Sequence, residues 1–284
     1  ICYTESKRKL PKMSNYLSIP YQDLYGVATS FKEQYAEGIP FPHISFPNFF
    51  NPDFLEEVLA EFPDLSLLDT YKFKSPNEIK LASKGENGMG PKTREFVHFL
   101  NSESFLKFLQ ELTSIKETLL GDPYLVGAGL HEIKRGGLLK VHADFNKHSL
   151  TGLDRRLNVL VYLNKDWKEE YGGHFELWDR DMQKADKKIL PTFNTLAMFS
   201  TTDFSYHGHP DPLNCPSDRS RKSIALYYYS NGRPAEEVNQ GLQDHSTIFK
   251  ARKGHEKEVV RQQINWKQRA KRFIPPVFLD IIKK

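Results

Sequence analysis

The sequence predicts a mainly β protein with flanking helices, in which a double-stranded β-helix (jelly roll) is covered by N-terminal helices and a C-terminal helix. Three observations predict this class. Short β-rich runs bounded by Gly, Pro, Asn and Asp fill residues 124–232, apolar residues at helical spacing precede them, and a basic tail with aromatic residues follows them. The 284 residues include 39% hydrophobic ones, which is enough for one domain with a substantial core.

The N-terminal part is expected to be a helical support region over residues 13–123. Residues 1–12 precede Met13, which could be a natural start, so we expect them to be a leader or a cloning remnant. We therefore leave residues 1–12 out of the fold prediction.

Two helices are predicted inside the support region. The first follows a short strand at 41–46, because Asn51 is a good N-cap and Pro52 suits the first helical turn. The second is predicted over 102–120, where apolar residues again recur at helical spacing. The polar, Gly- and Lys-rich stretch 72–94 between them is predicted to be an exposed loop.

Residues 124–232 are predicted to form the double-stranded β-helix core. Short β-rich runs with turn residues between them are typical of an antiparallel sandwich or barrel. The predicted strands are 124–126, 131–134, 138–141, 157–163, 174–178, 195–199 and 223–229.

The tail is predicted to be a basic C-terminal helical extension, 233–284, that packs on the core. Residues 250–284 contain eleven Lys or Arg and three Asp or Glu, a net charge of +8, which leaves −4 for the rest of the chain. A polyanion-binding patch is one interpretation of this charge. A solvated helix face is favoured, since Val259, Trp266 and Phe273 could dock on the core and no nucleic-acid motif is present.

Composition excludes several classes. Two cysteines, Cys2 and Cys215, cannot form the disulfide framework of a small secreted protein. No apolar run is long enough for a membrane span, and no basic-then-apolar signal layout precedes the core. We expect a cytoplasmic protein with no membrane partner, and nucleic acid is not an expected partner either.

His142 and Asp144 are candidate metal ligands because residues i and i+2 of a strand point to the same face. A third ligand could come from His207 or His209, which follow the predicted strand 195–199. Two histidines and one carboxylate form the facial triad that binds iron in non-haem oxygenases. An isolated H-x-D is more often a structural pair, so the order of the downstream residues carries the prediction.

Arg221 completes that order. A dicarboxylate that chelates a metal at one end needs a fixed cation at the other, and a guanidinium binds a carboxylate through two hydrogen bonds. Ser223 shares a strand face with Arg221 and could donate to the same carboxylate. Tyr162 could also reach it, although a tyrosine inside a barrel is as often core. The alternative is that Arg221 is a surface charge on a basic turn with Arg219.

These motifs together resemble the iron(II)/2-oxoglutarate oxygenases, and within them the prolyl-4-hydroxylase-like branch. The resemblance covers about 130–230 and implies a cupin-like double-stranded β-helix with Fe(II) at one open end, 2-oxoglutarate and O₂ as cosubstrates, and ascorbate as a possible addition. The matching residues are His142-Ala143-Asp144, Leu157 to Trp167, Gly172-Gly173, His207 and Arg221-Lys222-Ser223.

The resemblance also implies roles for single residues. His142, Asp144 and His207 would be the metal ligands and, with Arg221, the catalytic set. Tyr162 would be a second 2-oxoglutarate contact, Phe175 would line its pocket and His131 could be a further contact or a core histidine. The segment between His207 and Arg221 is longer than in the hypoxia-type members and contains three prolines, so Arg219 is a rival to Arg221 and His209 to His207.

The expected reaction is hydroxylation of an unactivated C–H bond, with release of succinate and CO₂. A prolyl residue of a peptide or protein is the first expectation, and a free amino acid or a carrier-linked saccharide is the alternative. Asn146 and Asn158 are candidate substrate contacts. Two competing classes are a non-catalytic metal-binding jelly roll and a cupin-like enzyme of other chemistry, which would usually need more histidine ligands. Nothing in the sequence indicates an oligomeric state.

Overall fold

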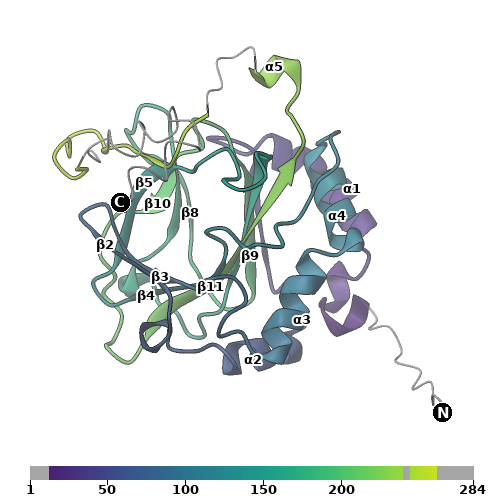
Figure 1. The fold of residues 1–284 in the computed structure, drawn as a ribbon, viewed down its shortest axis with the longest axis horizontal. Coiled ribbons are helices and arrows are strands. Elements are labelled where there is room, and N and C mark those ends of the chain that lie inside the picture. Colours follow the sequence, from purple (N-terminus) through teal and green to yellow (C-terminus); the bar gives the residue numbers. More distant parts are fainter. Residues whose placement is uncertain (1–12, 239–243, 261–284) are drawn as a thin grey trace, which may run out of the picture.

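The computed structural model describes residues 13–238 and 244–260 (Figure 1). The predicted leader 1–12 and the tail beyond residue 260 lie outside the described residues. The helices are α1 (Leu24–Ala36), α2 (Pro52–Ala60), α3 (Pro91–Leu100), α4 (Glu103–Thr113) and α5 (Ala235–Val238), with 3₁₀ turns at Met13–Asn15, Ile19–Tyr21, Leu65–Leu67 and Glu169–Tyr171.

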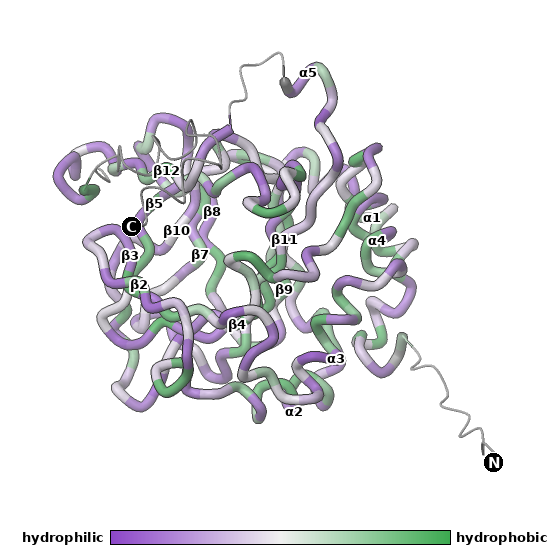
Figure 2. Tube along the Cα trace, in the orientation of Figure 1, coloured by the Kyte–Doolittle hydropathy of each residue, from purple (hydrophilic) through white to green (hydrophobic). Residues whose placement is uncertain are grey.

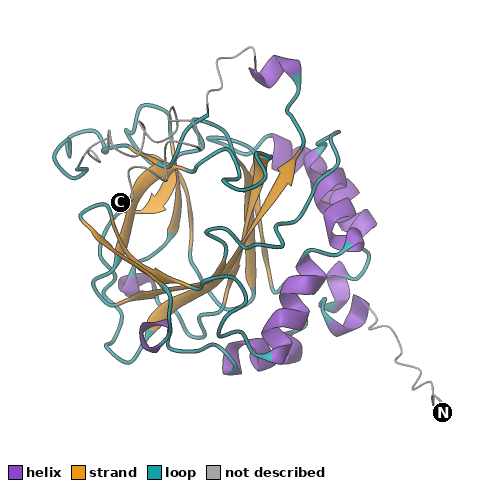
Figure 3. Cartoon of the chain, in the orientation of Figure 1, coloured by secondary structure: helices purple, strands orange, loops and turns teal. Residues whose placement is uncertain are grey.

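Twelve strands form one antiparallel sheet that curls into two facing walls (Figure 3). They are β1 (His43–Pro47), β2 (Tyr71–Ser75), β3 (Glu78–Ala82), β4 (Gly129–Lys134), β5 (Leu138–Ala143), β6 (Asp154–Tyr162), β7 (Phe175–Trp178), β8 (Ala185–Ile189), β9 (Thr195–Ser200), β10 (His207–His209), β11 (Ser220–Ser230) and β12 (Ile248–Phe249). The strand order is β1-β9-β6-β11-β4-β3-β5-β10-β7-β8, with β2 on β3 and β12 on β5. The mainly β, jelly-roll prediction is confirmed.

β3 joins the two walls. Its Leu81 lies opposite Glu132 of β4, and its Glu78 lies opposite Leu139 of β5. Because β3 pairs with a strand of each wall, the sheet is nearly closed and its inner face surrounds a cavity. Side chains that point inward from both walls can therefore meet.

The helices cover the outer face of one wall, as predicted (Figure 1). Alternate residues of β6 divide between the faces: Leu157, Val159 and Val161 belong to the large core shared with the helices, whereas Tyr162 belongs to a second cluster inside the barrel. In Figure 2, α1 and α4 alternate between hydrophobic and hydrophilic colours, as expected for helices with one buried face. The inner face is left for polar residues.

The predicted helix starts are confirmed. The Asn51 side chain accepts hydrogen bonds from the backbone N–H of Asp53 and Phe54, and Ser102 caps α4 through the N–H of Phe105. The second helix ends earlier than expected, at Thr113, because the next residue has a left-handed backbone with φ of 59°.

The exposed loop predicted over 72–94 is wrong. It contains most of the β2–β3 hairpin and the start of α3, which has Pro91 at its first turn. The hairpin escaped detection because several of its apolar residues are exposed, Ile79 among them, so it has no clean alternation. The strand predicted at 124–126 is also wrong, because those residues lie in a turn with a left-handed Leu125.

The described part of the tail contains β12 and, at residues 235–238, the four-residue α5. The long C-terminal helix was predicted around residues that lie mainly outside the described chain. Arg252, one of the basic tail residues, forms ion pairs with Asp211 and Glu258 and is largely buried by them. At this position the positive charge is neutralised within the chain.

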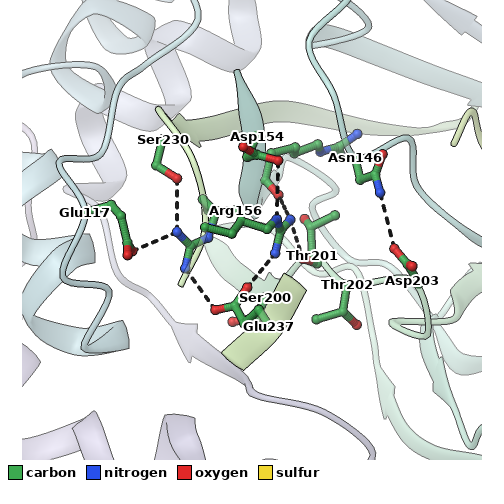
Figure 4. A network of polar contacts seen from close by, with 12 residues as sticks. Glu117, Asn146, Asp154, Arg156, Ser200, Thr201, Thr202, Asp203, Ser230 and Glu237 are labelled. Carbon is green, nitrogen blue, oxygen red and sulfur yellow. Dashed lines mark hydrogen bonds and ion pairs between the residues drawn. The ribbon is translucent and has the colours of Figure 1, made fainter. Parts of the chain in front are cut away.

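A polar network fixes the ends of β6 and β11. The Arg156 guanidinium donates to Glu117, Ser230 and Glu237, so it joins the segment after α4, the end of β11 and α5 (Figure 4). Arg233 donates to the carbonyl oxygens of residues 155 and 201 nearby. These contacts hold the start of β6 where it approaches the cavity.

Candidate metal centre

His142, Asp144 and His207 come together on the inner face of the barrel. Their candidate ligand atoms all lie within 4.8 Å of one another, and all three residues are buried. His142 Nε2 is 3.5 Å from Asp144 Oδ1, and His207 Nε2 is 3.5 Å from Asp144 Oδ2. Cross-strand pairing explains the approach, because His207 of β10 lies directly opposite His142 of β5. Among the described residues, these side chains form the one cluster with metal-binding geometry.

Backbone contacts prepare both histidines to bind a metal. The Nδ1 atom of His142 is 2.9 Å from the carbonyl oxygen of Lys140, and Nδ1 of His207 is 2.9 Å from that of Ser205. Each carbonyl holds the proton on Nδ1, so Nε2 keeps a free lone pair. Burial, with the neighbouring His142, lowers the pKa of His207 to about 3, which keeps its imidazole neutral.

The Asp144 carboxylate is held by two side chains of β6. Arg155 Nη2 and Asn158 Nδ2 donate to Oδ2 at 2.9 and 3.0 Å. Burial opposes the charged form, but the Arg155 guanidinium and the two histidines outweigh it, so the pKa of Asp144 lies well below its usual value. Arg155 is fully buried between the rings of Phe145 and Tyr227. Asp144 is therefore an oriented anion.

Arg221 lies inside the barrel next to Tyr162. Its Nε donates to the carbonyl oxygen of Gly173 at 2.8 Å, and its Nη2 donates to the Tyr162 hydroxyl at 3.1 Å. Gly173 has a φ of 73°, and a Cβ there would meet Leu213 Cδ2 at 2.5 Å and Arg221 Cδ at 3.0 Å. Arg219 points elsewhere, to the carbonyl oxygens of Lys165 and Asp166.

The other predicted cosubstrate contacts lie around these residues. Ser223 is buried on β11, opposite both Tyr162 and His131. Phe175 is buried with its ring centroid 5.6 Å from that of His207. His131 donates to or accepts from the carbonyl group of Gly127 and lines the cavity beside the metal cluster.

The two predicted substrate contacts occupy different places. Asn158 points at Asp144, as described above. Asn146 points away from the metal cluster to Asp203, and its Oδ1 accepts the backbone N–H of His245 (Figure 4). His245 Nε2 lies 2.9 Å from the same Asp203 carboxylate. These three residues fasten the C-terminal segment 244–260, hereafter the strap, to the barrel.

A cavity of about 290 Å³ opens beside the metal cluster. Its walls come from the β2–β3 hairpin on one side and from the strap on another. Residues of the strap pair with β5 directly at the cluster: Phe249 lies opposite His142, with ring centroids 5.5 Å apart. The lining residues are Tyr71, Phe73, Glu78, Lys80, Ala82, Gly127, His131, Leu139, His142, Asp144, Phe145, Tyr227, Ser246, Thr247 and Phe249.

Several residues at the site were not predicted from the sequence. Arg155 could have been noticed, since two consecutive arginines in an otherwise apolar strand must place one of them inward. Lys80 and Phe249 gave no signal, because the hairpin and the strap have no strong periodicity. His209 was considered only as a rival metal ligand, and it lies outside the metal cluster.

Residues 128–229 match the family model described as 2OG-Fe(II) oxygenase superfamily. These residues belong to that superfamily. The matched range begins just before β4 and ends within β11, so it contains the three clustered side chains together with Arg221 and Tyr162. The superfamily expectation drawn from the sequence is confirmed, and the chain is a 2-oxoglutarate-dependent dioxygenase that uses Fe(II).

Relatives in this superfamily act on proline. The chain is 27% identical over 199 residues to the Mus musculus protein named prolyl 3-hydroxylase OGFOD1, covering 67% of this chain and 33% of the relative. The chain therefore spans about a third of the length of that relative.

Two solved structures share the fold. One is a Trichoplax adhaerens prolyl hydroxylase in complex with a hypoxia inducible factor peptide, with a TM-score of 0.54, 19% identity, and coverage of 79% of this chain and 96% of that one. The other is a Pseudomonas putida prolyl-4-hydroxylase, with a TM-score of 0.51, 13% identity, and coverage of 74% and 100%. At these identities the likeness concerns the fold.

The donor set fits the metal of the superfamily. Two neutral imidazoles and one carboxylate on one side of an ion are the ligands of non-haem Fe(II) sites, and they leave positions open for a cosubstrate. A buried guanidinium with a tyrosine hydroxyl beside it suits the far carboxylate of 2-oxoglutarate. None of the described helices is both long and apolar enough to cross a membrane.

Proposed function

We propose that the chain hydroxylates a prolyl residue of a peptide or protein, with conversion of 2-oxoglutarate and O₂ to succinate and CO₂. The observation that carries this proposal is the opening of the cavity beside the metal cluster, between aromatic side chains of the hairpin and the strap. The similarity to a prolyl 3-hydroxylase supports the same substrate class.

In this proposal His142, Asp144 and His207 would hold Fe(II), which supplies the redox chemistry of O₂ activation. Arg221 and Tyr162 would bind the far carboxylate of 2-oxoglutarate, and Gly173 leaves the space that the Arg221 side chain needs. Arg155 and Asn158 would act as positioning residues, because both donate to Asp144. We assign Asn158 this role in place of a substrate contact.

The cavity lining favours an uncharged cyclic side chain. Tyr71, Phe73, Tyr227 and Phe249 offer ring surfaces against which the apolar ring of a prolyl residue could pack. A free amino acid would require separate partners for an ammonium and a carboxylate. The charged pair on the hairpin, Lys80 and Glu78, is instead 3.4 Å apart and mutually paired.

The experiment is a turnover screen with purified protein, Fe(II), 2-oxoglutarate, ascorbate and O₂. Substrate panels would comprise proline-containing peptides, matched peptides with alanine in place of proline, free amino acids and glycans. Succinate release and the gain of one oxygen atom in product mass would be measured together, with Asp144→Ala as the blank.

The expected result is succinate release coupled to oxygen addition on proline-containing peptides alone, and no turnover in the blank. Coupled turnover on an amino acid or a glycan would contradict the prolyl proposal but keep the reaction class. Failure to form a complex with 2-oxoglutarate in the presence of Fe(II) would contradict the site assignment itself.

A further inference from the structure

His209 is a buried histidine with no assigned role in the site described so far. It is 4% exposed, and neither ring nitrogen has a hydrogen-bond partner among the described residues. The Asp211 backbone favours its charged form, but without the geometry of a hydrogen bond. The other buried histidines of the described chain are each hydrogen-bonded: His43, His142, His148 and His207.

The strand register places His209 on the cavity side of β10. His207 and His209 are two residues apart on this strand, so their side chains leave the same face, and that of His207 enters the metal cluster. His209 lies opposite Leu139 of β5, which lines the cavity. Gly208 between them has no room for a side chain, because a Cβ would meet the carbonyl oxygen of Leu139 at 2.7 Å.

The charges around His209 belong to the two ends of the site. After burial itself, the groups that oppose its protonation are Arg221, Lys80 and His142, in that order. His209 is therefore close to the cation proposed for the far carboxylate of 2-oxoglutarate and also to a candidate metal ligand. A molecule that reaches from one to the other must pass near it.

An unpaired polar ring inside a protein costs free energy, unless a ligand supplies the partner. A neutral imidazole has one N–H donor and one acceptor nitrogen. We propose that His209 is a cosubstrate-positioning residue whose ring N–H donates a hydrogen bond to a carboxylate oxygen of 2-oxoglutarate, between the metal cluster and Arg221. This inference rests on 2-oxoglutarate being the cosubstrate, and it does not depend on which substrate is hydroxylated.

The test compares binding of 2-oxoglutarate to the wild-type protein, His209→Leu and His209→Gln. Calorimetry with Mn(II)-loaded protein gives the affinity without turnover, and the anaerobic Fe(II)–2-oxoglutarate charge-transfer band reports how the cosubstrate is held. His98→Leu, an exposed histidine on α3, is the matched control.

We expect His209→Leu to weaken 2-oxoglutarate binding roughly 10- to 100-fold, the effect of one lost hydrogen bond to a charged group. His209→Gln retains an N–H donor and should recover most of that affinity. Mn(II) affinity, the melting temperature and the control should stay close to wild type.

Wild-type affinity and an unchanged band in His209→Leu would overturn the proposal. Loss of Mn(II) affinity in both variants would also overturn it, since His209 would then be a metal ligand. If His209→Leu fails to fold, His209→Gln and His209→Phe decide by the same comparison. If the wild-type protein itself does not bind 2-oxoglutarate, the cosubstrate assignment fails, and that result is distinct from the others.

Discussion

The deep end of the cavity and its mouth are built in different ways. The metal cluster, Arg221 and Tyr162 are buried on paired strands of the barrel, and most of their polar atoms have defined partners. The mouth is formed by the β2–β3 hairpin and the strap, which carry partly exposed aromatic rings. The comparison indicates that the strands fix the chemistry common to the superfamily, while the hairpin and the strap choose the substrate.

If this division holds, changes at the deep end should impair cosubstrate or metal binding whatever the substrate. Changes at the mouth should impair substrate binding and leave the cosubstrate untouched. The following predictions test each half of that statement.

The largest effect is expected for Arg221→Ala. Removal of a buried, hydrogen-bonded cation should weaken 2-oxoglutarate binding roughly a hundredfold or more, as measured by calorimetry with Mn(II)-loaded protein. Arg219→Ala is the matched control, because it removes the same group two residues away, where it contacts only surface carbonyls. An equal loss in both variants would contradict the assignment of Arg221.

The second prediction concerns the metal-free protein. His207 has a folded pKa of about 3 against an ordinary value of 6.5, so the unfolded chain binds more protons in this window. Stability should therefore be full above pH 6.5 and fall on acidification, by about 2 kcal/mol between pH 6.5 and 5 from this group alone. Urea unfolding with a chelator would measure it, and His207→Leu should flatten the slope. A slope that is the same in both proteins would contradict the prediction.

A smaller effect is expected for Asn158→Ala. The Asp144 carboxylate would lose one of its two donors from β6, and loss of such outer contacts typically lowers metal affinity about tenfold. Competition with a fluorescent chelator would measure Mn(II) affinity, and the melting temperature would control for folding. Unchanged affinity would mean that Arg155 alone orients the carboxylate.

The smallest effect is expected at the mouth. Phe249→Ala should raise the KM of a peptide substrate severalfold and leave 2-oxoglutarate affinity unchanged, because the ring lines the cavity beside His142. Ile248→Ala is the matched control, since this neighbouring residue of β12 is 42% exposed and does not line the cavity. A loss of cosubstrate affinity in Phe249→Ala would remove the distinction between the two regions.

The same difference explains what could be predicted from the sequence. His142 and Asp144 obey strand parity, and Arg221 has a chemical reason that follows from a dicarboxylate cosubstrate, so the deep end was predictable from local patterns. The partners Arg155 and His209 required the cross-strand register, which a single sequence does not contain. The mouth was missed because β12 has only two residues and the hairpin exposes Ile79.

The network around Arg156 sets a lower limit on how far the chain can be shortened. Arg156 is buried, and one of its two carboxylate partners is Glu237, seven residues beyond the last strand of the barrel. A protein cut directly after β11 would leave that guanidinium half neutralised and would remove the wall that Phe249 provides. The smallest working unit should therefore be sought at residue 260 or beyond, well past the end of the β-helix itself.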